Sequence, residues 1–167
     1  MKAMDKSELF LSVIDSNKGI IYKVANSYCK NSENRSDLVQ EIIIHLWKSF
    51  GNYNEQYEHS TWMYRIALNV AISFYRKAKK ELATPLTDNI IALVKDDEPG
   101  ELEENVSLLY QFINELDELN KALMLLYLDN KTHKEMAEVL GISETNVATK
   151  IGRIKEKLKK KFSLANS

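Results

Sequence analysis

The 167-residue sequence contains a single cysteine, Cys29, and only three histidines. One cysteine excludes an internal disulfide, and the scattered histidines, His45, His59 and His133, lack the spacing of metal ligands. The sequence also shows no nucleophile paired with a base and no glycine-rich loop that would cradle a phosphate. We therefore expect no catalytic residue, no metal ion and no cofactor, and the chain is not predicted to be an enzyme.

Long apolar runs are absent as well, since no stretch approaches the roughly 20 residues that span a bilayer. Asp5 and Glu8 fall within the first ten residues, where a signal peptide has an uninterrupted apolar core. These features predict a cytoplasmic protein without direct membrane insertion. Five glycines and two prolines leave few turns for a many-stranded β fold, whereas the abundant Leu, Lys, Glu and Ala favour helices. The expected fold is all-α.

The charges nearly cancel, with 23 Lys and Arg against 24 Asp and Glu, but they are unevenly distributed. Residues 62–80 contain five basic and no acidic residues, and residues 121–167 contain ten basic and five acidic residues. Between them, residues 81–120 contain one basic and eleven acidic residues. Two basic segments separated by an acidic one predict two separate contacts with a polyanion.

The acidic segment also contains both prolines, Pro85 and Pro99, which interrupt helices. We interpret residues 81–107 as an acidic linker between two small helical domains, residues 1–80 and 108–167. Helical periodicity predicts elements at 7–30, 36–50 and 60–80 before the prolines, and at 102–116, 119–129, 134–140 and 144–162 after them.

The predicted helix 36–50 has two different faces. Apolar residues at steps of three and four should face the core: Leu38, Val39, Ile42, Ile43, Leu46, Trp47 and Phe50. The opposite face contains Asp37, Gln40, Glu41, Ile44, His45 and Lys48. An exposed isoleucine among acidic residues is typical of a partner-binding helix, although a solvated face with one stray isoleucine is the more frequent explanation of such a segment alone.

The predicted helix 60–80 combines aromatic and basic residues. Its core face should contain Met63, Ile66, Ala67, Val70, Ala71 and Phe74. A second stripe contains Trp62, Arg65, Asn69, Ser73 and Arg76, extended by Lys77, Lys79 and Lys80. Rings beside cations are typical of surfaces for unpaired nucleic acid, because bases stack on the rings while cations hold the phosphates. Packing of Trp62 and Tyr64 at the helix start explains the aromatic residues equally well.

Residues 132–147 follow the pattern of a helix-turn-helix. The first helix is predicted to end at Gly141, because glycine readily adopts the positive φ of a sharp turn. Its inward-facing residues should be Met136, Ala137 and Leu140. Ser143 is expected to cap the second helix by accepting a hydrogen bond from the amide of Thr145 or Asn146. An ordinary helical hairpin is the alternative, but the turn, the cap and the charge together favour the DNA-binding motif.

The second helix of this motif should expose a small and partly basic surface. Its core face is expected to contain Val147, Ile151, Ile154, Leu158 and Phe162. Ala148 and Gly152 keep the opposite side narrow enough to enter a groove, which makes Glu144, Thr145 and Thr149 the predicted base-edge readers. The cations that would neutralise phosphates are Lys150, Arg153, Lys155, Lys157, Lys159, Lys160 and Lys161.

With both halves considered, the chain resembles the bacterial sigma-70 family of RNA polymerase sigma factors, specifically the small two-domain extracytoplasmic-function (ECF) type. The family's second region contains a D-L-V-Q-E helix and then T/S-W-L-Y-R-I-A-x-N, which correspond to Asp37–Glu41 and Thr61–Asn69. The fourth region's E-I-A-x-x-L-G-I-S-x-x-x-V pattern corresponds to Glu135–Val147. A helix-turn-helix alone is common to many regulators, whereas both motifs in this order are specific.

The resemblance implies a factor that binds core RNA polymerase at its clamp helices and flap and directs it to promoter DNA. It implies that the clamp helices are contacted by Asp37, Gln40, Glu41 and Ile44. The residues implied for the minus-ten element are Tyr57, Trp62, Arg65, Asn69, Arg76 and Lys77, with the loop 51–59 capturing a flipped base. Those implied for the minus-thirty-five element are Glu144, Thr145, Thr149, Lys150, Arg153 and Lys155. An anti-sigma factor is a further partner that the family allows.

The family's linker threads through the RNA channel of the polymerase, so we hypothesise that Asp96, Asp97 and Glu98 mimic a phosphate chain there. Two departures prevent the transfer of a promoter preference: His133-Lys134 replaces a frequent aromatic-acid pair, and Ala148 replaces a frequent basic residue.

Two other functions compete with this one. A stand-alone helix-turn-helix transcriptional regulator would dimerise on palindromic operators. A polymerase-binding or single-strand-binding accessory protein would not need residues 120–167. The N-terminal motif argues against the first alternative, and the helix-turn-helix argues against the second.

Overall fold

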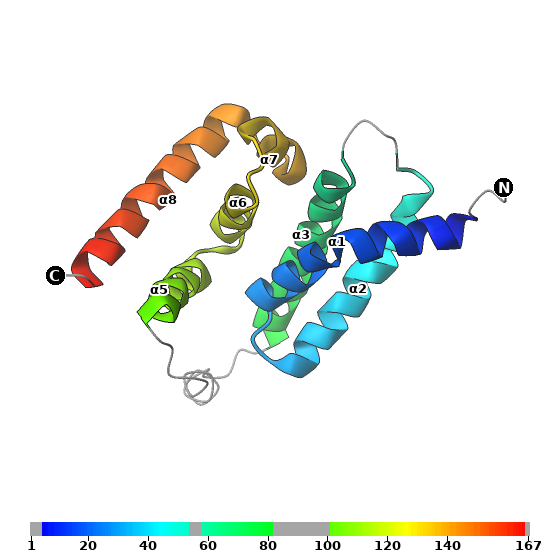
Figure 1. Cartoon of the computed structure of the whole chain (residues 1–167), viewed down its shortest axis with the longest axis horizontal. Helices are drawn as coiled ribbons and strands as arrows, with labels where there is room; N and C mark the ends of the chain where they lie inside the picture. The colour runs from blue at the N-terminus through cyan, green and yellow to red at the C-terminus, as the bar shows by residue number, and fades with distance from the viewer. Residues whose placement is uncertain (1–4, 54–57, 82–100, 166–167) are drawn as a thin grey trace. The chain divides into compact units, whose positions relative to one another are not determined.

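The computed structural model describes residues 5–53, 58–81 and 101–165, which form seven helices and no strand. The chain divides into two compact units, residues 1–83 and 84–167, each built only of helices in its described part (Figure 1). The predicted all-α fold with two small domains is therefore confirmed. Residues 96–98, the proposed phosphate mimic, lie outside the described residues.

The first unit contains three helices, α1 (Lys6–Tyr28), α2 (Ser32–Phe50) and α3 (His59–Glu81), and each contacts the other two. Asp5 caps α1 by accepting a hydrogen bond from the amide of Glu8 at 2.8 Å. Asn17 interrupts the helical backbone of α1, and its side-chain amide donates to the Val13 carbonyl at 2.9 Å. The long apolar pattern of this helix is thus split by one kink.

Helix α2 begins earlier than its apolar pattern predicts. The Asn31 side chain accepts hydrogen bonds from the amides of Glu33 and Asn34, at 2.8 and 3.4 Å, and so satisfies two amides of the first turn. In the core, Leu38, Ile42 and Leu46 are fully buried. The three residues expected beside them, Val39, Ile43 and Phe50, are only partly buried.

The structure overturns the prediction for one aromatic residue, Trp47, and settles the burial of another, Tyr64. Trp47, expected in the core, is 38% exposed; its ring packs edge-on against Phe10 at 5.0 Å and beneath the Lys6 ammonium at 4.8 Å. Tyr64, for which packing at the start of the helix was one of the two explanations, is fully buried, and its hydroxyl accepts a hydrogen bond from Lys23 of α1 at 3.4 Å. The core face of α3 therefore extends round to Tyr64 and Leu68, both fully buried, because α1 covers that side of the helix.

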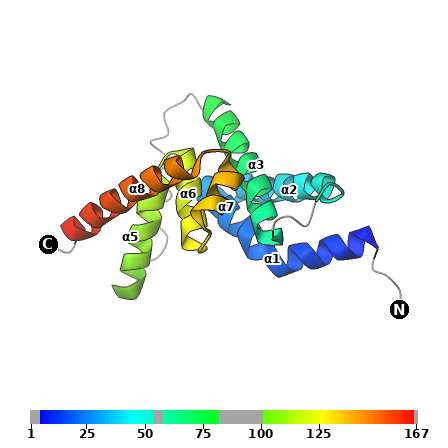
Figure 2. The same ribbon diagram turned by 90° about the horizontal axis from the view of Figure 1, so that it is seen from above.

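The second unit contains α5 (Glu101–Glu115), α6 (Glu118–Leu128), α7 (His133–Leu140) and α8 (Glu144–Ala165), seen from above in Figure 2. Helix α6 contacts the other three, and residues 121–126 are all buried. Such continuous burial explains why its sequence is apolar on nearly every side. Helix α5 begins within the range that we predicted as linker.

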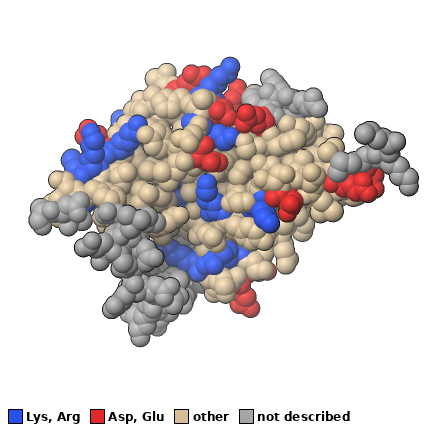
Figure 3. Space-filling model, viewed as in Figure 1, with Lys and Arg blue, Asp and Glu red and all other residues tan. Residues whose placement is uncertain are grey.

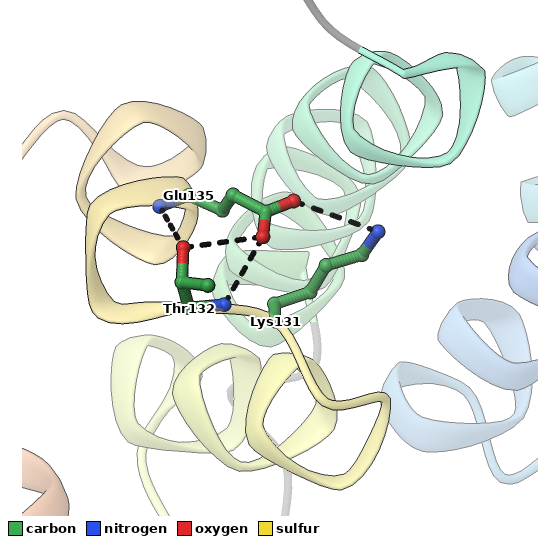
Figure 4. Close-up of polar contacts among 3 residues, drawn as sticks. All are labelled: Lys131, Thr132 and Glu135. Carbon is green, nitrogen blue, oxygen red and sulfur yellow. Dashed lines mark hydrogen bonds and ion pairs between the residues drawn. The ribbon is translucent and has the colours of Figure 1, made fainter.

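A capping box starts α7 (Figure 4). The Thr132 hydroxyl accepts a hydrogen bond from the Glu135 amide at 3.1 Å, while the Glu135 carboxylate accepts one from the Thr132 amide at 3.2 Å. The same carboxylate lies 3.8 Å from the ammonium of Lys131, whose side chain is nearly buried. These bonds fix the direction in which the chain enters the helix-turn-helix.

The turn of the helix-turn-helix forms as predicted. Gly141 ends α7 with φ 68° and ψ 34°, and its amide donates to the Ala137 carbonyl at 2.8 Å. Ser143 accepts a hydrogen bond from the Asn146 amide at 3.1 Å and caps α8. Of the three residues expected to face inward, only Met136 is buried; Ala137 and Leu140 are half-buried, and Val139, which was not in the expected set, is buried.

Candidate polymerase and nucleic-acid interfaces

The outer side of α2 exposes a mixed acidic and apolar ridge. Asp37, Gln40 and Ile44 are all exposed, and Ile44 shows 46% of its surface. Glu41 is exposed too; its carboxylate lies 3.7 Å from the imidazole of His45, one turn further along α2, and both residues line a groove between α2 and α3. The four residues predicted to dock therefore share one helix surface, with Glu41 at its α3 edge.

The exposed stripe of α3 is present as predicted. Arg65, Asn69, Ser73 and Arg76 are exposed, as is Lys77 at the basic end. Steps of three and four residues place these side chains along one side of the helix. Tyr57, the remaining residue predicted for minus-ten contacts, lies outside the described residues.

Trp62 begins this stripe but is half-buried in a chain of aromatic rings. Its ring centroid lies 6.0 Å from that of Phe50 and 5.2 Å from that of Tyr53. The Tyr53 ring in turn lies 4.9 Å from the His59 ring. These contacts hold the Trp62 ring in place at the start of α3. Because the ring is only half-buried, part of its surface stays open to a ligand.

Helix α8 presents a narrow outer face. Val147, Ile151 and Ile154 are buried, which turns Thr145, Thr149 and Gly152 outward, and all three are exposed. The Thr149 hydroxyl donates to the Thr145 carbonyl at 3.0 Å, so toward a ligand this hydroxyl can only accept. Nothing lies within 4 Å of the point where a Cβ of Gly152 would stand.

Asn146 lies on the same exposed side and was missed by sequence reasoning, which used it only as a capping partner of Ser143. Its backbone amide is bound by Ser143, but its side-chain amide makes no hydrogen bond with another described residue. An asparagine side chain on a recognition helix can donate to and accept from one adenine edge. Glu144, by contrast, precedes Val147 by three residues and so lies nearer the buried side of the helix.

Lysine and arginine side chains gather over α8 and near the end of α3 (Figure 3). Along α8, Lys150 is half-buried, while Arg153 and Lys155 are exposed. Two lysines have partners in their own unit: the Lys155 ammonium lies 4.6 Å from the Tyr127 ring centroid, and Lys161 forms an ion pair with Glu115. The basic surface of α8 thus also ties this helix to α5 and α6.

Within the described ranges, none of the helices combines the length and the apolar composition that a membrane-spanning segment needs. The same residues bring together no group of His, Cys, Asp and Glu able to hold a metal ion. What the two units do present is a helix-turn-helix with a basic second helix and a separate helix lined by aromatic and basic residues. This combination is typical of an all-α nucleic-acid-binding protein.

Comparison with known families assigns both units. Residues 13–81 match the model for sigma-70 region 2, and residues 107–158 match the model for sigma-70 region 4. Among curated proteins, the ECF RNA polymerase sigma factor SigW of Bacillus subtilis is 25% identical, with 93% of this chain and 89% of SigW covered. SigM of the same organism, also an ECF sigma factor, is 27% identical, with 83% and 86% covered.

Two solved structures share the fold. One is CnrH in complex with the cytosolic domain of CnrY, with a TM-score of 0.66, 19% identity, and coverage of 95% of this chain and 89% of CnrH. The other is the sigma factor RpoE of Bartonella quintana in complex with the anti-sigma factor NepR, with a TM-score of 0.66, 15% identity, and coverage of 94% and 96%.

The chain belongs to the sigma-70 family and is a sigma factor of the ECF type. It is a transcription initiation factor that binds core RNA polymerase and directs it to promoter DNA. The region 2 match argues against a stand-alone operator-binding regulator. The region 4 match argues against a single-strand-binding accessory protein.

Proposed function

We propose that the two units divide the work of promoter recognition by residue. Residues 1–80 form the domain that docks on the polymerase and opens the minus-ten element, residues 81–107 form the acidic linker, and residues 108–167 form the domain that reads the minus-thirty-five element. The observation that supports this division is that two exposed helix faces in the first unit, on α2 and α3, differ in chemistry.

The α2 surface is the proposed contact with the polymerase clamp helices. Ile44 supplies an exposed aliphatic centre, and Asp37, Gln40 and Glu41 surround it with polar and acidic groups. An apolar centre with a polar rim is the usual anatomy of a protein interface. The lack of basic side chains among these four residues keeps this surface from competing for DNA phosphates.

The α3 stripe is the proposed minus-ten surface. Trp62, Arg65, Asn69, Arg76 and Lys77 combine one ring, one amide and three cations. Unstacking a flipped base costs a few kcal/mol, and stacking on a ring returns about 1–3 kcal/mol per base. Tyr57 in the 51–59 loop remains the proposed second ring of this surface.

The outer face of α8 is the proposed minus-thirty-five reader. Thr145 and Thr149 lie where base edges would be met, with Glu144 beside them at the start of the helix, and we add Asn146 to this set because its side-chain amide is exposed. The phosphate contacts are assigned to Lys150, Arg153 and Lys155. Gly152 lets the backbone of α8 approach the base pairs closely.

The same proposal makes the protein a non-catalytic, cytoplasmic factor, since it works on core polymerase and promoter DNA. It also includes an anti-sigma factor as a partner. Both solved neighbours were determined with a bound protein, NepR being named an anti-sigma factor. In this chain an apolar groove of about 220 Å³ between α1 and α2, lined by Leu11, Tyr22 and Ile43 among others, would accept an apolar segment of such a protein.

A titration of fluorescently labelled protein with core polymerase lacking other sigma factors tests this function. Saturable binding, followed by transcription from promoters selected out of a random library, is the expected result. Enriched promoters should contain two separated elements. If the folded protein fails to bind active core polymerase and selects palindromic duplexes instead, the operator-binding regulator is the better description.

A further inference from the structure

An exposed stripe runs along the outer side of α1. We call it the α1 stripe, and its four residues are Leu11, Asp15, Lys18 and Tyr22. Leu11 is 64% exposed and Tyr22 is 53% exposed, so two large apolar side chains of this helix face solvent. All four residues border the apolar groove between α1 and α2, whose α2 wall contains Val39 and Ile43. They therefore share one side of α1, both before and after the kink at Asn17.

The spacing of the α1 stripe is that of a helix–helix contact. Its residues follow one another at steps of four, three and four, as the a and d positions of a coiled-coil seam do. An apolar residue stands at each end, and the two charged residues stand between them. The Lys18 ammonium lies 3.5 Å from the Asp15 carboxylate, and both side chains remain exposed. The stripe is therefore suited to a second helix that brings an apolar residue to each end and opposite charges to the middle.

A second copy of α1, running in the opposite direction, meets these requirements. The order apolar, acidic, basic, apolar becomes apolar, basic, acidic, apolar when the direction of the helix is reversed. Leu11 of one protomer then faces Tyr22 of its partner. Asp15 faces Lys18 in the same way, and two-fold symmetry repeats both contacts. A parallel pair would instead place Asp15 against Asp15 and Lys18 against Lys18, which is unfavourable.

We propose that two copies of this protein associate through their α1 stripes as an antiparallel, two-fold symmetric dimer. Charge complementarity selects this occupant of the face, because each Asp15 would lie between its own Lys18 and that of the other protomer. Charged residues within a seam weaken a contact but fix its register and direction. A weak and reversible dimer is therefore expected, rather than a permanent one.

The dimer goes beyond the proposed function, although it has consequences for it. The groove beside the α1 stripe is the one proposed above for an apolar segment of an anti-sigma factor, so a second copy and that segment would exclude each other. Val39 and Ile43 in its α2 wall are sequence neighbours of Gln40 and Ile44, so a dimer would also crowd the proposed polymerase contact. Only these consequences rest on the proposed function, because the dimer is measured on the protein alone.

Sedimentation equilibrium of the full-length protein, without polymerase or DNA, measures the association. Wild-type protein should show a monomer–dimer equilibrium over a series of concentrations. Asp15→Lys and Lys18→Asp each place like charges across the seam and should weaken dimerisation at least about tenfold. Both residues are exposed, so the fold should tolerate the changes, which thermal unfolding verifies. Lys134→Asp is the matched control, because it makes the same change of charge at an exposed lysine of α7 and should leave the dimer unchanged.

An equal mixture of Asp15→Lys and Lys18→Asp gives the sharpest result. Across the seam, the two lysines of the first variant face the two aspartates of the second, so both ion pairs are regained. The mixture should associate about as tightly as the wild type, although neither variant does so alone. Within each chain the like charges remain, so a change in the stability of α1 cannot produce this recovery.

Single cysteines test the register of the dimer. The native Cys29 is buried and does not compete. When Leu11→Cys and Tyr22→Cys are mixed in a glutathione redox buffer, the two new thiols should form a disulfide, which needs Cα atoms within about 7 Å. Leu11→Cys alone should not form one, because in the antiparallel pair the two copies of position 11 lie about 16 Å apart along the helix axes.

Three results would overturn the proposal. They are a wild-type protein that stays monomeric throughout the series, a mixture of the two charge variants that stays monomeric, and a disulfide between two Leu11→Cys chains, which would indicate a parallel pair. In each case the groove is left to the anti-sigma segment proposed above. None of these results bears on core polymerase binding, which is measured separately on the same wild-type protein.

Discussion

The side-chain nitrogen of Lys155 on α8 lies 4.6 Å from the ring centroid of Tyr127 on α6. A cation held over a ring is stabilised by about 0.5–1 kcal/mol at an exposed site. Lys155 would lose this stabilisation if it left the Tyr127 ring to contact a phosphate. Arg153, also exposed, has no partner of this kind among the described residues. The two cations, both predicted to contact phosphates, are therefore unequally available.

We expect Arg153→Ala to weaken holoenzyme binding to promoter duplex more than Lys155→Ala does. Loss of one phosphate contact should lower the slope of log affinity against log salt by about 1, and Lys155→Ala should change it by clearly less. Fluorescence anisotropy over a salt series measures both slopes. Equal slopes for the two variants would contradict this ranking. Tyr127→Leu is the control, since it releases Lys155 without removing its charge.

Gly141 and Gly152 offer a matched pair for stability. An added Cβ meets no atom within 4 Å at either position, but Gly141 has φ 68° and Gly152 is helical. Gly141→Ala should therefore destabilise the protein by about 1 kcal/mol, since an L side chain is strained in the left-handed region. Gly152→Ala should stabilise it by up to about 1 kcal/mol, through helix propensity. Urea unfolding of both variants checks the opposite signs, and a shared sign would refute the explanation.

The helices could be predicted from the sequence because apolar residues repeat at helical spacing in every one of them. Their starts were less predictable. Residues 32–35 of α2 contain no apolar side chain, so periodicity begins only at Leu38, whereas the helix begins where Asn31 caps it. The kink at Asn17 could not be predicted for a related reason. The hydrogen bond from the Asn17 side chain to the Val13 carbonyl leaves the spacing of the apolar residues unchanged.

The site residues were predictable as exposed or buried but not in their contacts. Periodicity correctly turned Ile44, Arg65 and Thr149 outward. It placed Trp47 in the core although this side chain is 38% exposed, and it left open whether Tyr64 packs at the start of its helix. Asn146 was overlooked because its capping role accounted for its backbone and left its side chain unconsidered.

The capping box of α7 should contribute measurably to stability. Thr132→Ala removes the hydroxyl that accepts from the Glu135 amide and should cost about 1 kcal/mol. Thr132→Ser keeps that hydroxyl and should retain most of the stability. Urea unfolding compares the two variants with the wild type. An alanine variant as stable as the serine variant would mean that solvent replaces the bond without loss.

Arg65 and Trp62 should separate promoter opening from folding. Arg65 is exposed, so Arg65→Ala should reduce opening of the minus-ten element while leaving stability and polymerase affinity unchanged. Trp62→Ala also removes ring contacts with Phe50 and Tyr53 and should cost about 2 kcal/mol of stability in addition. Permanganate reactivity of unpaired thymines reports opening. Loss of polymerase binding in Arg65→Ala would show that the stripe is misassigned.

Ile44 should matter for polymerase binding and not for folding. Its side chain is 46% exposed at the centre of the proposed docking surface, so Ile44→Asp should leave the free energy of unfolding nearly unchanged. In a complex, the carboxylate would be buried without a partner, and affinity for core polymerase should fall at least about tenfold. Glu41→Lys should also lower the affinity for core polymerase, because it reverses a charge of the docking surface.

Leu128→Asp is the matched control, because Leu128 is 45% exposed on α6 and belongs to none of the proposed surfaces. Unchanged polymerase affinity in both Ile44→Asp and Glu41→Lys would remove the docking surface from α2, whereas an equal loss in Leu128→Asp would show that the effect is not specific to it.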